Sequence, residues 1–234
     1  MIFSPKSKFD NFLYKQYFYH NFKKNFAGIN VKNFENAVNI ISQSQKNNVP
    51  VVFCSNHSNW WDASLAIFLC LEYFKIDAYY LITGIEKLNK NFDKLGVVNL
   101  KEDNIAAEVI SIGNYLKGSS KFLWIFPQSE ITDNNNDIKF SSVVSDLVEN
   151  LKEVVLLSCM IDYHYTDSKK PEIFLDFFES KNFTGISYLN KESFTMNLEQ
   201  KFEYKIKEFQ QKLASRDTED FRKILEGKKK QQIK

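Results

Sequence analysis

A histidine and an aspartate in the stretch NHSNWWD have the clearest chemical potential in this sequence. Asp62 follows His57 by five residues, so a short turn brings its carboxylate against the imidazole. In such a pair the carboxylate fixes the tautomer of the ring and stabilises the imidazolium, while the second ring nitrogen takes a proton from a hydroxyl. The spacing therefore predicts a general-base centre.

The elements on either side must position this pair. Residues 51–55 read VVFCS, an apolar run typical of a buried strand, and the apolar spacing from Ala63 to Phe74 predicts a helix after it. A strand-to-helix turn holds side chains on a rigid scaffold and leaves them accessible. Among the three histidines of the chain, only His57 has this position.

The same residues also fit a structural role. Asn56 or Ser58 is a suitable helix cap, and Asp62 then interacts favourably with the helix dipole while His57 is an ordinary polar side chain. The spacing alone does not decide between the two interpretations.

Composition excludes several classes of protein. The three cysteines (Cys54, Cys70 and Cys159) form no C-x-x-C pair, so neither a disulfide framework nor a thiolate zinc site is indicated, and no metal is expected. A net charge of only +2 gives little support to nucleic-acid binding. The start of the sequence lacks the apolar core of a signal peptide, which favours a cytoplasmic location.

Aromatic residues crowd the N-terminal segment, which reads KFDNFLYKQYFYHNFKKNF from residue 8 to residue 26. Phe18, Phe22 and Phe26 form a ridge with helical spacing, and lysines flank it. We expect a surface helix. Aromatics on its other faces indicate that part of it packs on the domain, and contact with a membrane surface is the alternative use of the exposed part.

Alternating strand and helix patterns predict an α/β fold, with a mostly parallel central sheet flanked by helices. Further strands are expected at 78–83, 96–100, 121–126, 154–161 and 173–178, and helices at 33–45, 104–116 and 140–152. From residue 191 the chain is predicted to be helical, to break near 215–218 and to end in a short helix beginning near Asp220. We divide the single domain into an N-terminal helix (1–30), a core (31–190) and C-terminal helices with a basic tail (191–234).

Several blocks of the sequence resemble the glycerolipid acyltransferase family, the lysophosphatidate acyltransferase-like proteins. NHSNWWD after VVFCS is similar to the NHxxxxD block of that family, and FPQSE at residues 126–130 is similar to its FPEG-type block. FDKLGVVNLKEDN at 92–104 resembles the intermediate block, and VVLLSCMIDY at 154–163 resembles the apolar strand block. With FAGINVKN near the start and DFRKILEG near the end, the resemblance covers nearly the whole chain.

The resemblance implies an O-acyltransferase in which His57 deprotonates an acceptor hydroxyl and Asp62 orients the histidine. The acyl donor would be acyl-CoA or acyl carrier protein, with no further cofactor, and the enzyme would be peripheral on the inner face of a membrane. The implied acceptor-binding residues are Lys101, Phe126, Pro127, Gln128 and Glu130. Trp60 and Trp61 are candidates for an acyl groove, although a tryptophan beside a helix start is as often a core anchor.

The chain departs from the family pattern in its FPEG-type block. The glutamate and glycine of that block are Gln128 and Ser129 here, with Glu130 as a candidate replacement for the lost carboxylate. The arginine that usually follows is absent, and Lys139 is a possible substitute for its charge. A lysophospholipid phosphate therefore loses a partner, so a glycolipid, sugar or pigment hydroxyl becomes a serious candidate acceptor. A catalytically silent lipid- or partner-binding relative and a thioesterase-like hydrolase are the alternatives.

Overall fold

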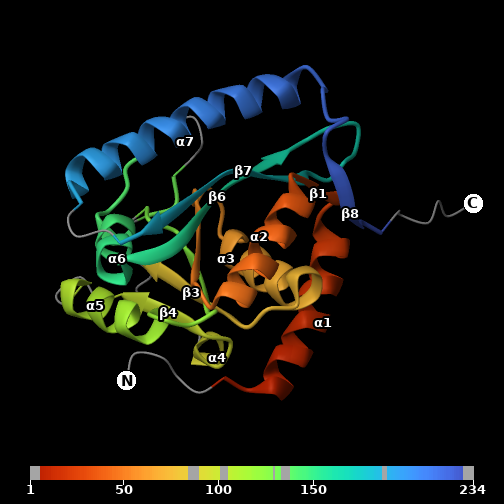
Figure 1. Ribbon diagram of the computed structural model, residues 1–234. Helices are drawn as coiled ribbons and strands as arrows, with labels where there is room; N and C mark the ends of the chain where they lie inside the picture. The colour runs from red at the N-terminus through yellow and green to blue at the C-terminus, as the bar shows by residue number, and fades with distance from the viewer. Residues whose placement is uncertain are drawn as a thin grey trace, which may run out of the picture.

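A single eight-stranded sheet forms the centre of the computed structural model, with the strand order β4-β3-β5-β2-β6-β7-β1-β8 (Figure 1). The structure describes residues 6–83, 90–100, 105–128, 130–132, 138–185 and 189–228. Five neighbouring strands are parallel to one another: β4 (Val97–Leu100), β3 (Ala78–Thr83), β5 (Phe122–Ile125), β2 (Val51–Ser55) and β6 (Glu153–His164). β7 (Glu172–Thr184) runs antiparallel to β6, β1 (Gly28–Lys32) is parallel to β7, and β8 (Arg222–Glu226) closes the edge antiparallel to β1.

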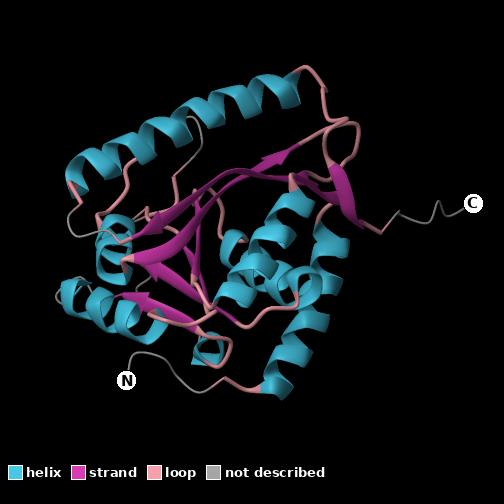
Figure 2. Ribbon diagram, viewed as in Figure 1, coloured by secondary structure: helices cyan, strands magenta, loops and turns pink. Residues whose placement is uncertain are grey.

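Helices cover both faces of the sheet (Figure 2). One face carries α1 (Lys8–Asn25), α2 (Phe34–Asn47) and α3 (Asp62–Phe68), and the other carries α5 (Ile105–Leu116), α6 (Val143–Leu151) and α7 (Lys191–Ala214). The side chains of β2 alternate between the two halves of the core. Val51 and Phe53 point to the first face, and Val52 and Cys54 point to the second. A short helix, α4 (Lys90–Asp93), precedes β4. The predicted α/β fold class is confirmed.

Two of the sequence-based predictions of local structure need correction. The segment expected to form a short helix near Asp220 is instead the strand β8, so a single helix, α7, precedes it rather than several C-terminal helices. The helix expected from Ala63 to Phe74 begins at Asp62 as α3 and continues from Leu69 to Phe74 as a π-helix, η1. The strand β1, inside the stretch FAGINVKN, was not predicted.

The N-terminal helix α1 is anchored on the domain by one face. Phe18 and Phe22 are buried in the first core layer, and the Phe22 ring lies 5.3 Å from the ring of Trp61. On the other side, the Phe9 and Phe12 side chains are 69% and 58% exposed. The prediction that part of this helix packs on the domain is confirmed. In the described part of the chain, no helix combines the length and the apolar character needed to cross a bilayer.

Candidate active site

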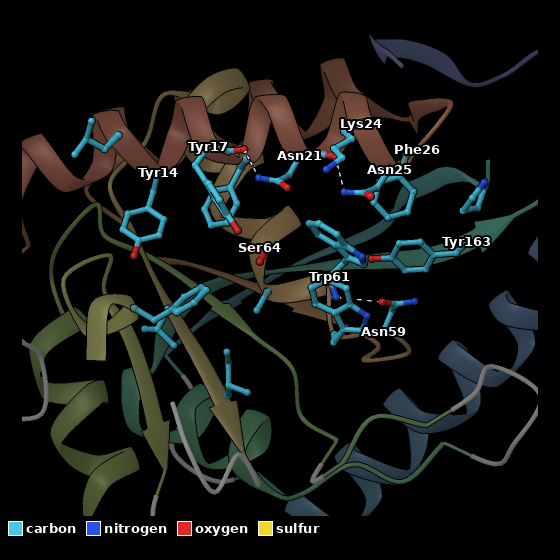
Figure 3. Close-up of a pocket in the computed structure, with 18 of the residues that line it drawn as sticks. Tyr14, Tyr17, Asn21, Lys24, Asn25, Phe26, Asn59, Trp61, Ser64 and Tyr163 are labelled. Carbon is cyan, nitrogen blue, oxygen red and sulfur yellow. Dashed lines mark hydrogen bonds between the residues drawn. The ribbon is translucent and has the colours of Figure 1, made fainter. Parts of the chain in front are cut away.

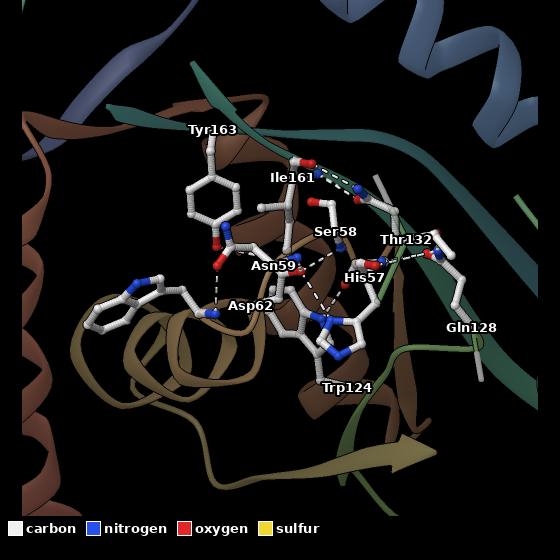
Figure 4. Close-up of polar contacts among 12 residues, drawn as sticks. His57, Ser58, Asn59, Asp62, Trp124, Gln128, Thr132, Ile161 and Tyr163 are labelled. Atoms are coloured by element: carbon white, nitrogen blue, oxygen red, sulfur yellow. Dashed lines mark hydrogen bonds and ion pairs between the residues drawn. The ribbon is translucent and has the colours of Figure 1, made fainter. Parts of the chain in front are cut away.

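The predicted His57–Asp62 pair lies at the carboxyl edge of the parallel part of the sheet (Figure 4). β2 is flanked by β5 and β6, both parallel to it, so the segments that follow these strands meet at one edge. His57 comes two residues after the end of β2, and Gln128 comes three residues after the end of β5. Ligand sites in open α/β sheets form at this edge.

Asp62 is fully buried and opens the helix α3. Its Oδ2 atom lies 3.1 Å from His57 Nδ1 and accepts hydrogen bonds of 2.8 Å from the backbone N–H groups of Ser58 and Asn59. The turn is compact because the Asp62 N–H donates to the Asn59 carbonyl at 3.0 Å. The five-residue spacing therefore does what the sequence predicted: the chain folds back and places the carboxylate against the imidazole.

This geometry defines the tautomer of His57. A carboxylate oxygen only accepts hydrogen bonds, so the His57 Nδ1 atom carries the proton that faces Asp62. In the neutral ring, Nε2 then keeps its lone pair, and within the residues that the structure describes it has no hydrogen-bond partner. The arrangement is suited to removing a proton from a hydroxyl that reaches Nε2.

Tyr163, near the end of β6, completes the surroundings of the buried carboxylate. Its hydroxyl donates a hydrogen bond of 2.7 Å to Asp62 Oδ1. Burial raises the pKa of the Tyr163 phenol well above its ordinary value, and the charge of Asp62 raises it further, so the phenol keeps its proton at neutral pH. Sequence reasoning missed this residue. The available signal was a hydroxyl-bearing side chain at the end of the predicted strand 154–161.

Gln128 binds the backbone of His57. Its Oε1 accepts the His57 N–H at 2.5 Å, and its Nε2 donates to the Thr132 hydroxyl. The Thr132 N–H in turn donates to the His57 carbonyl at 3.0 Å. The FPQSE block thus contacts the NHSNWWD block directly, through a buried amide; Thr132 is a second contact that sequence reasoning missed.

The other predicted acceptor residues are spread around this core. Phe126 is buried, with its ring centroid 4.9 Å from that of His57, and the Pro127 carbonyl accepts the Ser141 N–H at 2.9 Å. Glu130 is exposed, as is Lys139. Lys101 and Ser129 lie outside the described residues. The structure therefore brings Phe126 and Gln128 to the His57–Asp62 pair, while Pro127 packs against residue 141 and Glu130 faces solvent.

A groove of about 1360 Å³ lies between α1 and the first turn of α3 (Figure 3). Its lining is rich in aromatic rings, including Tyr14, Tyr17, Trp60, Trp61 and Tyr163. Trp60 is 66% exposed, whereas Trp61 packs with its ring 5.4 Å from that of Phe26. Trp61 thus combines the two roles considered from the sequence, groove lining and core anchor.

His57 is not among the residues that line this groove, and only 3% of its surface is exposed. Tyr163 connects the two regions because it lines the groove and also donates to Asp62. The pair is therefore next to the groove but shielded from it.

Other reactive groups are placed away from this edge or are shielded. Cys54, Cys70 and Cys159 are free and buried. Burial raises the pKa of the Cys70 thiol to about 12, and it also raises those of Cys54 and Cys159. Across the described ranges, no group of three or more His, Cys, Asp and Glu side chains is arranged to hold a metal ion.

Comparison of the sequence with protein-family models found no matching family, and comparison with curated proteins found no match either. The resemblance to glycerolipid acyltransferases therefore stays a prediction that depends on the sequence blocks.

Proposed function

We propose that this protein is an O-acyltransferase that moves a fatty acyl group from acyl-CoA or acyl carrier protein to the hydroxyl of a lipid-like acceptor. The observation that carries the proposal is the buried pair in which Asp62 Oδ2 lies 3.1 Å from His57 Nδ1 and leaves Nε2 free to accept a proton. The sequence blocks that resemble the glycerolipid acyltransferases give this pair its reaction.

The proposed reaction uses His57 first as a base and then as an acid. Nε2 takes the proton of the acceptor hydroxyl as its oxygen attacks the thioester carbonyl, which gives a tetrahedral oxyanion. Collapse of this intermediate forms the ester and breaks the carbon–sulfur bond. The leaving thiolate takes the proton from the imidazolium, which restores the neutral ring. Asp62 stabilises the imidazolium while it exists.

The aromatic groove beside the pair is suited to an acyl chain or another lipid-like group, since its walls offer large apolar rings with a few polar atoms. The exposed side chains of Phe9 and Phe12 on α1, with lysines nearby in the sequence, fit a peripheral position on the inner face of a membrane. The acceptor is a lysophospholipid or another lipid-like hydroxyl. Because the cation expected after the FPEG-type block is missing, a glycolipid, sugar or pigment hydroxyl is a candidate beside the lysophospholipid.

One observation favours a second candidate function. The His57 ring is 3% exposed and does not line the groove, as expected for a lipid-binding protein in which the pair is structural. Such a protein would bind the lipid and leave both donor and acceptor unchanged.

Incubation of the purified protein with labelled acyl-CoA or acyl carrier protein and a panel of hydroxyl acceptors separates these functions. We expect a labelled ester from the wild type and a loss of at least about a hundredfold in His57→Ala. His20→Ala is the matched control, because His20 is exposed on α1, where its ring is hydrogen-bonded to the Gln16 carbonyl and packs on the neighbouring Tyr19 ring. Free fatty acid without acceptor dependence would indicate a hydrolase. Lipid binding without turnover of any donor would indicate the silent binding protein.

A further inference from the structure

We infer that Tyr163 is a positioning residue, whose hydroxyl holds the Asp62 carboxylate in the orientation that binds His57. The contact itself is independent of any reaction. Its kinetic consequence rests on the proposed acyltransferase function.

The two carboxylate oxygens of Asp62 have different hydrogen-bond partners. Oδ2 binds His57 Nδ1 and two backbone N–H groups, while Oδ1 accepts the Tyr163 hydroxyl at 2.7 Å. Because a carboxylate is planar, fixing Oδ1 also fixes the rotation of the group and hence the direction of Oδ2. Removing the Tyr163 hydroxyl leaves Oδ1 without this donor, so the orientation of the carboxylate is held less firmly while its charge stays beside the imidazole.

The sheet holds Tyr163 at the correct distance from the pair. Asn56, directly before His57, donates to the Ile161 carbonyl and accepts the Ile161 N–H, both at 2.8 Å. These two bonds tie the end of β2 to β6 only two residues before Tyr163. The Tyr163 ring also packs 5.7 Å from that of Phe26. The hydroxyl is therefore delivered to Asp62 by a braced part of the fold.

Tyr163 is also the part of this network that faces the groove. His57 does not line the groove, whereas the Tyr163 side chain does (Figure 3). A molecule in the groove therefore contacts the network at Tyr163, and Asp62 passes any displacement of that ring to the imidazole.

The charges around the network set the direction of the expected pH effect. Among the described residues, the titratable groups that interact with Asp62 include His57, Tyr163 and Cys159. Cys159 stays neutral because burial raises its pKa, and Asp162 lies beside Tyr163. The charge of Asp176 on β7 also raises the pKa of Cys159, and Lys205 of α7 forms an ion pair of 3.0 Å with Asp176. The Tyr163 hydroxyl points its positive end at the carboxylate. Without it, the charge of Asp62 is less compensated and stabilises the imidazolium more.

The test compares Tyr163→Phe with Tyr73→Phe. The Tyr73 hydroxyl also donates a hydrogen bond of 2.7 Å, but to the Ile224 carbonyl, so the control loses the same group from another place. Histidine NMR follows the titration of His57, and the pH dependence of kcat/KM is measured in parallel. In Tyr163→Phe we expect the His57 midpoint and the acidic limb of the rate profile to rise together by about one pH unit. We also expect kcat to fall about tenfold with little change in KM. In Tyr73→Phe, the His57 midpoint, the rate profile and kcat should stay as in the wild type.

A second measurement does not depend on the folding of the variant. Incorporation of fluorotyrosine replaces a ring hydrogen by fluorine, which makes each phenol a stronger hydrogen-bond donor and keeps its hydroxyl. It should lower the His57 midpoint, the opposite of the effect of Tyr163→Phe.

The outcomes separate the two proposals. An unchanged His57 midpoint in Tyr163→Phe, or in the fluorotyrosine protein where that variant does not fold, overturns the positioning role even if the wild type transfers acyl groups. A shifted midpoint in a protein that makes no ester from any donor supports the positioning role and overturns the proposed function.

Discussion

Replacement of Asp62 by asparagine removes the charge of the network and preserves its shape. The oxygen side of the new amide must face the Ser58 and Asn59 N–H groups, which now bind Oδ2 at 2.8 Å, because the opposite orientation would set three donors against an NH₂ group. Nδ1 of His57 then still meets an oxygen. The NH₂ group faces Tyr163, whose hydroxyl oxygen can accept. We therefore expect Asp62→Asn to keep the His57 tautomer and to lose only the carboxylate charge.

The magnitude follows from that difference. A hydrogen bond to a charged group is worth about 1.5–3 kcal/mol, so the imidazolium formed in the reaction loses that stabilisation. At about 1.4 kcal/mol per factor of ten, the acyl-transfer rate should fall roughly 10- to 150-fold. The free energy of unfolding should change by only about 1 kcal/mol. Asp62→Ala should instead cost about 3–5 kcal/mol, because it leaves the Ser58 and Asn59 N–H groups and the Tyr163 hydroxyl without their acceptor.

The assay measures kcat/KM for ester formation in the wild type, Asp62→Asn and Asp62→Ala, together with urea unfolding of each protein. A rate for Asp62→Asn within about threefold of the wild type would show that the charge is not used, and the assigned role of Asp62 would be wrong. If Asp62→Asn lost activity far beyond about 150-fold, then the backbone N–H groups would not be holding the amide as argued.

Further predictions concern the scaffold around the site. Gln128→Leu leaves the buried His57 N–H without its acceptor, so urea unfolding should show a loss of about 1–3 kcal/mol; unchanged stability would contradict the contact. Phe22→Ala should lower the free energy of unfolding by about 3–5 kcal/mol, because the Phe22 ring is fully buried. Phe12→Ser should leave thermal stability unchanged and weaken sedimentation with anionic vesicles. Equal vesicle binding of Phe12→Ser and the wild type would remove α1 from the membrane proposal. Burial raises the pKa of Tyr80 well above its ordinary value, so above about pH 10 the unfolded phenol loses its proton while the folded one keeps it. The free energy of unfolding should therefore fall by up to about 1.4 kcal/mol per pH unit. Tyr80→Phe should make that fall less steep in alkaline urea titrations.

The parallel strands were predictable because each is covered on both faces. A strand buried in this way is a short continuous apolar run, as in VVFCS for β2 and FLWI for β5, and both were found within a residue or two of their limits. The edge strand β8 reads RKILE, with one buried side chain, Leu225. Such a segment has neither a helical nor a strand period, and it is a strand because it pairs with β1, some 190 residues away in the sequence. Tertiary pairing of this kind is not visible in local spacing.

The contacts of the candidate site also differ in whether they are local in the sequence. The contact between His57 and Asp62 is local, since a five-residue turn at a helix start determines it, and the sequence predicted it. Tyr163 reaches Asp62 from 101 residues away, and only because β6 lies beside β2 in the sheet. The strand order was not predicted, so this third member could not be. Gln128 was found through the block that it belongs to, but its hydrogen bond to the His57 backbone could not be predicted from the sequence.

That bond gives a physical reason for glutamine at residue 128. The side chain is 3% exposed, and it accepts one hydrogen bond from the His57 N–H while it donates another to Thr132. The amide also donates to the His57 carbonyl at 3.5 Å, a contact that an ionised carboxylate could not make, and a carboxylate at this place would bury a charge. Glutamine at residue 128, where the FPEG-type block that this segment resembles has glutamate, is therefore compatible with the arrangement of the His57–Asp62 pair. Under the proposed function, Lys101 and Lys139 stay the cations that the sequence predicts for recognition of an anionic acceptor.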